Sequence, residues 1–308
     1  MELIEICRDT YYFKSAVNIG YVHLKEQEKG MLIDAGLDSQ SMKKVIKKLE
    51  EKKLPLTHLI ITHSHADHYG GAAYLQSTKN IYTIAPQIEE AILRNPILAS
   101  VAFSHGNYPI EEIRNKFIEG QALEIDEVVD EGKYEVDGFS IELISLPGHS
   151  VNQMGILMND ILFAADSYFG IESLDKHKIP YIIDLEQTLS SLDKLSNLKC
   201  SGTVPGHGIY EENFQETVHA NKKVHQEILS SMRDIIDSYD DNGISHEQIV
   251  KQMCDRWDIK LFNMTSFVLY RTAITAYLTK LYKDQQVTLE IIDNTINIKQ
   301  KKEEKLST

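Results

Sequence analysis

The 308-residue sequence predicts an α/β protein with a small helical domain at its carboxyl end. Apolar residues make up 42% of the chain and charged residues 25%, which is the usual composition of a folded protein with a buried core. Strand-like and helix-like apolar patterns alternate up to about residue 212, whereas helical patterns dominate after it. We therefore expect a larger domain over residues 1–212 and a smaller one over residues 213–308.

In the larger domain, short apolar runs bounded by turn residues predict strands. They are expected at residues 16–24, 30–34, 57–62, 81–85, 132–137, 139–146, 154–158 and 161–165. Apolar residues at helical spacing predict helices at residues 41–49, 72–77, 87–93 and 185–195. The segment 96–120 has no clean period, and we interpret it as an insertion that contains a helix at Glu111–Ile118.

In the smaller domain, amphipathic patterns predict three helices, at residues 218–239, 245–257 and 266–281. Ser245 is a suitable amino-terminal cap for the second helix. Two short strands are expected after the helices, at residues 287–292 and 295–299. Helices followed by a terminal hairpin are typical of a winged-helix-like module.

The charge of the chain is strongly acidic, with 32 basic and 46 acidic residues and a net charge of −14. Residues 216–308 contain 13 basic and 14 acidic residues, so almost all of the excess acid lies in the larger domain. A polyanion such as nucleic acid is repelled by that charge unless a local basic patch outweighs it. The composition therefore favours a small-molecule partner.

The cysteines and the apolar segments indicate a cytoplasmic protein. Cys7, Cys200 and Cys254 lie far apart without a CxxC pair, as expected of reduced thiols rather than a disulfide framework. The first six residues include two glutamates where a secretory signal peptide has basic residues. No stretch approaches the roughly 18 apolar residues of a membrane span, so no membrane partner is expected.

A histidine-rich turn follows the buried strand predicted at 57–62. Its sequence, HSHADH over residues 63–68, places His63 and His65 on one side of an extended segment. Asp67 and His68 then stand at the start of a helix, where they can reach a second, neighbouring ion. Imidazole and carboxylate groups are zinc ligands, and one turn cannot complete either site.

Three later residues are candidates to complete these sites: His149, Asp166 and His207. Each stands at the end of an apolar strand or in a glycine-containing loop after one, where loops gather at one edge of a packed sheet. The alternative is that all of these are unrelated polar loop residues. The occurrence of the whole set in this order argues against that alternative.

Residues 15–210 resemble the metallo-β-lactamase superfamily of hydrolases. The resemblance rests on five motifs, LIDAG (32–36), HSHADH (63–68), PGH (147–149), FAAD (163–166) and PGH (205–207). It implies an αββα sandwich with a two-metal site between the sheets. It also implies that His63, His65 and His149 bind one ion. The other ion is expected on Asp67, His68 and His207, with Asp166 as the bridging ligand.

The implied chemistry is hydrolysis. Two divalent cations about 3.5–4 Å apart hold a bridging water and lower its pKa towards neutrality. We expect the resulting metal-bound hydroxide to attack the substrate, and Asp67 to orient it and pass its proton to the leaving group. All the expected ligand atoms are nitrogen or oxygen, which favours zinc, with iron and manganese as alternatives.

Other residues near these motifs are weaker candidates. The Tyr168 hydroxyl is a candidate oxyanion donor, and the alternative is a tyrosine packed beside Phe169 at the pocket wall. Asp34 is expected either to support a metal ligand through a hydrogen bond or to cap its own turn. Residues in segments that cover the site are interpreted as wall or surface residues: His105, Tyr108 and His177.

The motif indicates a reaction class and not a substrate. We expect a hydrolase of a small ester-like molecule, either a thioester, a lactone or a related carbonyl compound, with a pocket shaped by segments 96–120 and 167–184. The alternative is a phosphodiesterase or endoribonuclease whose carboxy-terminal module contacts RNA. A third possibility is that this module forms a homodimer, unless its helices simply pack on the sandwich.

Overall fold

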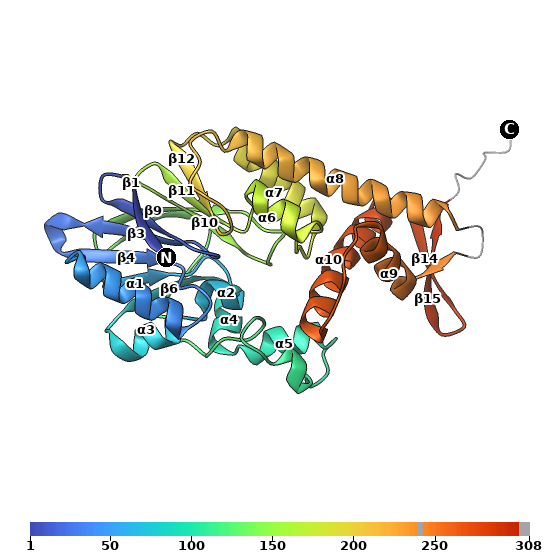
Figure 1. Cartoon of the computed structure of the whole chain (residues 1–308), viewed down its shortest axis with the longest axis horizontal. Helices are drawn as coiled ribbons and strands as arrows, with labels where there is room; N and C mark the ends of the chain where they lie inside the picture. Colours follow the sequence, from blue (N-terminus) through green and yellow to red (C-terminus); the bar gives the residue numbers. More distant parts are fainter. Residues whose placement is uncertain (240–242, 302–308) are drawn as a thin grey trace.

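Two β-sheets form the centre of the protein (Figure 1). The computed structural model describes residues 1–239 and 243–301. The first sheet has its seven strands in chain order: β1 (Glu2–Cys7), β2 (Thr10–Lys14), β3 (Ile19–Leu24), β4 (Lys29–Ile33), β5 (His58–Ile60), β6 (Tyr82–Pro86) and β7 (Glu127–Val129). Strands β1 to β4 are antiparallel neighbours, whereas β4 to β7 are parallel.

The second sheet has five strands in the order β12-β11-β10-β9-β8. Their bounds are β8 (Gly132–Val136), β9 (Phe139–Ser145), β10 (Met154–Met158), β11 (Ile161–Ala165) and β12 (Gly202–Pro205). Strands β8 to β11 are antiparallel, and β12 joins β11 in parallel after a helical crossover.

Some helices pack on the outer faces of these two sheets, and others form the carboxy-terminal region (Figure 1). Their bounds are α1 (Ser39–Glu51), α2 (Ala66–Tyr69), α3 (Ala72–Thr78), α4 (Glu89–Arg94), α5 (Ile97–Phe103), α6 (Ile171–His177), α7 (Leu185–Asn197), α8 (Gln215–Asp237), α9 (His246–Arg256) and α10 (Met264–Lys283). Helix α1 buries Met42, Val45 and Leu49 at helical spacing, and the Asp38 side chain caps it by accepting from the Ser41 main-chain nitrogen.

Alternation along the strands divides the core into layers. On β4, Met31 and Ile33 belong to the core between the sheets, whereas Leu32 packs with the α1 residues on the outer face. On the second sheet, Ile156 faces the inner core and Leu162 faces α7. The arrangement is the expected αββα sandwich.

The carboxy-terminal region adds a third sheet to three helices. Its strands are β13 (Ile244–Ser245), β14 (Val287–Ile292) and β15 (Thr295–Gln300), in the order β13-β15-β14. Helix α8 joins the two parts, because Phe214 and Val218 pack in the sandwich while Met232 packs with α9 and α10. The boundary after residue 212 and the winged-helix assignment stay predictions, and residues 240–242 and 302–308 of the predicted module lie outside the described residues.

The helix predicted at Glu111–Ile118 is wrong. Only a 3-10 turn forms there, at Glu111–Ile113, and the helix of the insertion is α5, which begins after Pro96. The side chain of Asn115 explains the difference, because it bonds the Glu112 carbonyl and the Phe117 main-chain nitrogen. A side chain that takes main-chain partners competes with the helix.

Two further expectations concern the cysteines and the membrane. Cys7, Cys200 and Cys254 are free, as predicted. Among the described residues, the helices are too short or too polar to cross a membrane.

Candidate metal centre

Loops that follow four strands meet at one edge of the sandwich. The histidine-rich segment 63–68 follows β5 and includes the start of α2, and His149 follows β9. Asp166 directly follows β11, and His207 follows β12. Because paired strands fix the starts of these loops, the side chains stand on a rigid scaffold. The structure therefore brings together all seven residues that the sequence suggested as metal ligands.

The first group contains His63, His65 and His149, whose nearest ring nitrogens all lie within 4.8 Å of one another. His65 Nδ1 lies 3.1 Å from His63 Nε2 and 2.8 Å from His149 Nε2. His63 and His149 are buried, whereas His65 is partly open to solvent. Three nitrogens converge on one point, as a metal site with histidine ligands requires.

The second group contains Asp67, His68 and His207. Asp67 Oδ2 lies 3.3 Å from His207 Nε2. Asp166 stands between the groups, because its Oδ1 is 3.3 Å from His68 Nε2, and its Oδ2 is 3.4 Å from His207 Nε2 and 3.3 Å from His149 Nε2. A bridging carboxylate needs such contacts with both groups.

The remote ring nitrogens of two histidines fix their orientation. His149 Nδ1 donates to the Tyr181 carbonyl at 2.9 Å, and His207 Nδ1 donates to the Ala16 carbonyl at 2.8 Å. A main-chain carbonyl only accepts, so in each neutral ring the proton resides on Nδ1. The Nε2 lone pair then points into the cluster, as it does in metal-binding histidines.

Asp34 gives the same support to His68. Its Oδ2 lies 2.7 Å from His68 Nδ1, and its Oδ1 accepts from the Thr62 main-chain nitrogen at 2.8 Å. Asp34 is buried and has a φ of 64°, a conformation that non-glycine residues seldom adopt outside functional or turn positions. Of the two expectations for Asp34, the structure shows the hydrogen bond to a candidate ligand.

The donor set fits a cation. Within the described residues, His68 Nε2 and Asp166 Oδ1 are buried without a hydrogen-bond partner, although they face each other at 3.3 Å. When the Nδ1 proton of a neutral His68 is donated to Asp34, the His68 Nε2 atom and the Asp166 Oδ1 atom both present lone pairs to each other. Such an arrangement is unfavourable unless a positive charge lies between the two atoms. Nitrogen and carboxylate oxygen donors suit a divalent transition metal such as zinc.

The pKa values of His68 and His207 also indicate that the site favours positive charge. Burial lowers the pKa of His68, but the carboxylates of Asp166 and Asp34 outweigh it and raise the pKa well above its usual range. Burial likewise opposes protonation of His207, yet Asp166 and Asp67 raise its pKa to about 10. The carboxylates therefore create a site that favours a cation.

Close packing keeps Asp166 in place. A Cβ atom on Gly206 would lie 2.1 Å from Asp166 Oδ1 and 2.8 Å from His68 Cε1, so only glycine fits there. Ala165, the residue before Asp166, has a φ of 49°. This uncommon backbone conformation adjoins the candidate bridging ligand, which is where functional sites often store strain.

Glu89 is a candidate positioning residue that the sequence analysis missed. Its buried carboxylate accepts from the Ser64 main-chain nitrogen at 2.9 Å, from the Ser150 hydroxyl at 2.7 Å and from the Asn152 main-chain nitrogen at 2.8 Å. The Ser64 hydroxyl bonds it as well. Because Ser64 separates His63 from His65 and Ser150 follows His149, Glu89 ties together the two loops of the first group.

Tyr168 lies in a different environment from the one expected of an oxyanion donor. Its side chain is buried against α7 and α8, and its hydroxyl bonds Thr203 and, at 3.3 Å, Glu211. The geometry therefore favours the structural alternative, although the packing partners are not the pocket wall that the sequence suggested. The catalytic assignment of Tyr168 stays a prediction without geometric support.

Aromatic rings from the two predicted pocket segments border the cluster. Phe169 stacks on His207 at a centroid distance of 5.7 Å, and the Tyr181 ring lies 5.3 Å from His65 and 5.4 Å from His149. Phe103 contacts Tyr181 at 6.1 Å. Tyr181 had no sequence signal, because its role depends on contacts with residues far away in the chain.

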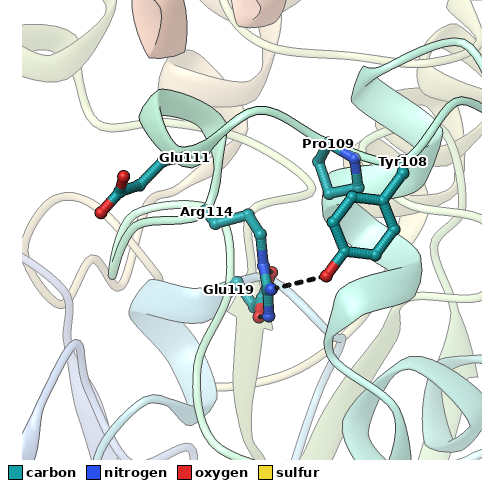
Figure 2. A pocket seen from close by; sticks show the side chains of 5 residues that line it. All are labelled: Tyr108, Pro109, Glu111, Arg114 and Glu119. Carbon is teal, nitrogen blue, oxygen red and sulfur yellow. Dashed lines mark hydrogen bonds and ion pairs between the residues drawn. The ribbon is translucent and has the colours of Figure 1, made fainter.

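A surface hollow of about 460 Å³ lies elsewhere in the insertion. Figure 2 shows Arg114 between Tyr108 and Glu119, both of which it contacts, at 3.3 Å and 2.6 Å. The guanidinium is thus already paired with a carboxylate. Among the side chains that line it, this hollow therefore offers no free cation to an anionic substrate.

Comparison with known proteins identifies relatives of this sandwich. Residues 14–207 match the family model of the metallo-beta-lactamase superfamily. The atrochrysone carboxyl ACP thioesterase of Aspergillus fumigatus is 27% identical over 206 residues, which are 66% of this chain and 53% of that protein. Thioesterase pkgB of Emericella nidulans is 26% identical over 191 residues, 61% of this chain and 45% of that protein. The chain thus spans about half the length of these curated relatives.

A solved structure extends the likeness of the fold. A beta-lactamase domain protein from Burkholderia ambifaria superposes with a TM-score of 0.73 at 16% identity, covering 97% of this chain and 93% of that one. The shared fold includes the carboxy-terminal helices as well as the sandwich. Because the family model covers more than half of the sequence, and includes every residue of the candidate centre, the chain belongs to the metallo-β-lactamase superfamily.

Proposed function

We propose that the protein is a metal-dependent hydrolase of small-molecule thioesters. The observation that supports it best is the position of Asp166 between two groups of ligand atoms, with unpaired buried atoms facing each other. We assign one divalent cation to His63, His65 and His149, and a second to Asp67, His68 and His207, with zinc favoured. When bound, such a pair polarises a carbonyl oxygen and lowers the pKa of water towards neutrality.

The chain's own residues divide the remaining work. The Asp67 side chain is 32% exposed, whereas Asp166 is 4% exposed, so Asp67 is the carboxylate of the centre that solvent and substrate reach. We assign Asp67 the orientation of the attacking water and the transfer of its proton to the sulfur of the leaving thiolate. Phe169 and Tyr181 exclude water from the cluster on two sides.

The thioester class rests on the relatives and on charge. Two of the curated relatives are named thioesterases, which supports cleavage of a carbon–sulfur bond here. Most of the net charge of −14 lies on the part of the chain that contains the centre, which favours a small substrate over a polyanion.

The alternative, an endoribonuclease, has less support. Five basic residues of the carboxy-terminal region are paired with acidic residues of the same region: Lys251 with Asp255, Arg256 with Asp234, Arg271 with Glu247, Lys280 with Asp284 and Lys299 with Glu290. RNA-binding surfaces instead present clustered basic side chains that are free to contact phosphates.

A substrate panel tests the proposal. Zinc-loaded protein and Asp166→Ala are assayed against a thioester, an aryl ester, a lactone, a bis-aryl phosphodiester and a short RNA, and the metal content of both is measured. We expect turnover of the thioester above the other compounds, and loss of both metal and turnover in Asp166→Ala. Preferential cleavage of the phosphodiester or RNA would establish the alternative. An Asp166→Ala variant with two tightly bound ions and full turnover would disprove the assigned bridging role.

A further inference from the structure

A groove of about 230 Å³ lies between α5, the segment before α7 and one face of α10. Phe103 and Ile183 form one side of it. The other side is the α10 face that contains Val268, Thr272 and Thr279. These α10 positions are spaced at helical intervals, and the stretch from 268 to 279 is about 16 Å long at 1.5 Å per residue. The groove is therefore elongated.

The groove adjoins the candidate metal centre. The Phe103 ring contacts the Tyr181 ring, which lies against His65 and His149. Ile183 is two residues beyond Tyr181, and its main-chain nitrogen bonds the Gly148 carbonyl at 2.8 Å. One aromatic ring, that of Tyr181, thus separates the groove from two candidate ligands.

The groove suits an uncharged, apolar chain. Phe103, Ile183, Val268 and Ala276 contribute apolar surface, and the threonines contribute methyl groups beside their hydroxyls. His105 and Arg271 also line the groove, and the Nε and Nη2 atoms of Arg271 both contact the Glu247 carboxylate, at 2.9 Å and 2.8 Å. Because this charge is already paired, an anionic ligand gains little there.

We propose that this groove binds the acyl chain of the thioester, so that α10 sets the acyl length that the enzyme accepts. The inference rests on the proposed function, because it places the carbonyl at the metal centre and the chain beyond Tyr181. It also gives the carboxy-terminal region a part in substrate selection.

Blocking the groove tests the proposal. Thr272→Trp fills the middle of the α10 face, and Thr272→Leu is a milder variant in case the larger side chain disturbs folding. Thr295→Trp places the same side chain on the exposed terminal hairpin as a control. The kcat/KM is measured for acetyl, butanoyl, octanoyl and dodecanoyl thioesters of N-acetylcysteamine. Calorimetry with uncleavable thioether analogues of the same lengths measures binding separately from turnover.

In wild type and Thr295→Trp, we expect both kcat/KM and affinity to rise with acyl length. In Thr272→Trp the octanoyl compound should lose about tenfold or more, while the acetyl compound changes little, as expected when a hydrophobic pocket is filled. An unchanged length dependence in both Thr272 variants, by both measurements, overturns the groove assignment and leaves the proposed function intact. Length-dependent binding that Thr272→Trp abolishes, without cleavage of any thioester, supports the groove and overturns the thioesterase function.

Discussion

Replacing Glu89 with glutamine tests how the first group of ligands is held. The Glu89 carboxylate accepts a main-chain N–H on each oxygen, from Ser64 on one and from Asn152 on the other. A glutamine amide accepts only through its oxygen, so one of these buried N–H groups must face an NH₂ group in either orientation. The loss of that acceptor costs about 1–3 kcal/mol.

This cost should appear in metal affinity, because the affected loops contain the candidate ligands. Changes to residues that orient metal ligands lower affinity about 10–100-fold. We expect Glu89→Gln to lower the affinity for one of the two ions by that factor, measured by competition with a chromophoric chelator. Glu90→Gln is the matched control, since Glu90 lies next along α4 and pairs with Arg94 at the surface.

Stability must be measured separately from affinity. Urea unfolding in excess chelator gives the free energy of unfolding without metal, and Glu90→Gln should change it by less than about 0.5 kcal/mol. A Glu89→Gln protein that is destabilised in chelator, yet binds both ions as tightly as wild type, would refute the reasoning. Glu89 would then support the fold without positioning the ligands.

Three further outcomes follow from the structure. Tyr168→Phe should lower the free energy of unfolding in urea by about 1–2 kcal/mol and leave kcat unchanged, because its hydroxyl bonds interior partners; a large fall in kcat with metal retained would contradict this. Gly206→Ala should displace Asp166 and reduce the bound metal measured by mass spectrometry, since overpacking costs about 1–3 kcal/mol. Burial lowers the pKa of His225 from 6.5 to about 4, so between these values the unfolded chain binds the extra proton. The contribution of neutral His225 to the free energy of unfolding should be complete above about pH 6.5 and should be lost as the pH falls towards 4, by up to about 3 kcal/mol. Urea unfolding of His225→Gln at several pH values should lack this part of the pH dependence.

The sandwich strands were predictable where both faces of a strand are buried. The runs 154–158 and 161–165 coincide with β10 and β11, because a short continuous apolar run between turn residues fits few structures other than a buried strand. The histidine motif was predictable for a related reason. A turn directly after a buried strand has a fixed origin, so its side chains converge with those of neighbouring strand ends.

Other features depend on contacts that the sequence pattern does not reveal. Strand β1 is a partly exposed edge, so its pattern was too weak to predict it. Glu89 looks like an ordinary surface residue beside Glu90, and only the fold buries it. Tyr168 was a sequence candidate and Tyr181 was not, yet packing placed Tyr168 in the interior and Tyr181 against His65 and His149.

The burial of the centre suggests how metal retention and substrate choice are separated. Asp34 and Glu89 are buried on the sandwich side, where substitution affects the ligands directly. The groove side is formed by Phe103 of the insertion and by α10, neither of which supplies a candidate ligand. We therefore expect changes in the insertion or in α10 to alter the proposed acyl-chain preference at little cost to the candidate metal centre. A Thr272→Trp protein that retains wild-type metal affinity but has a new chain-length preference would display that separation directly.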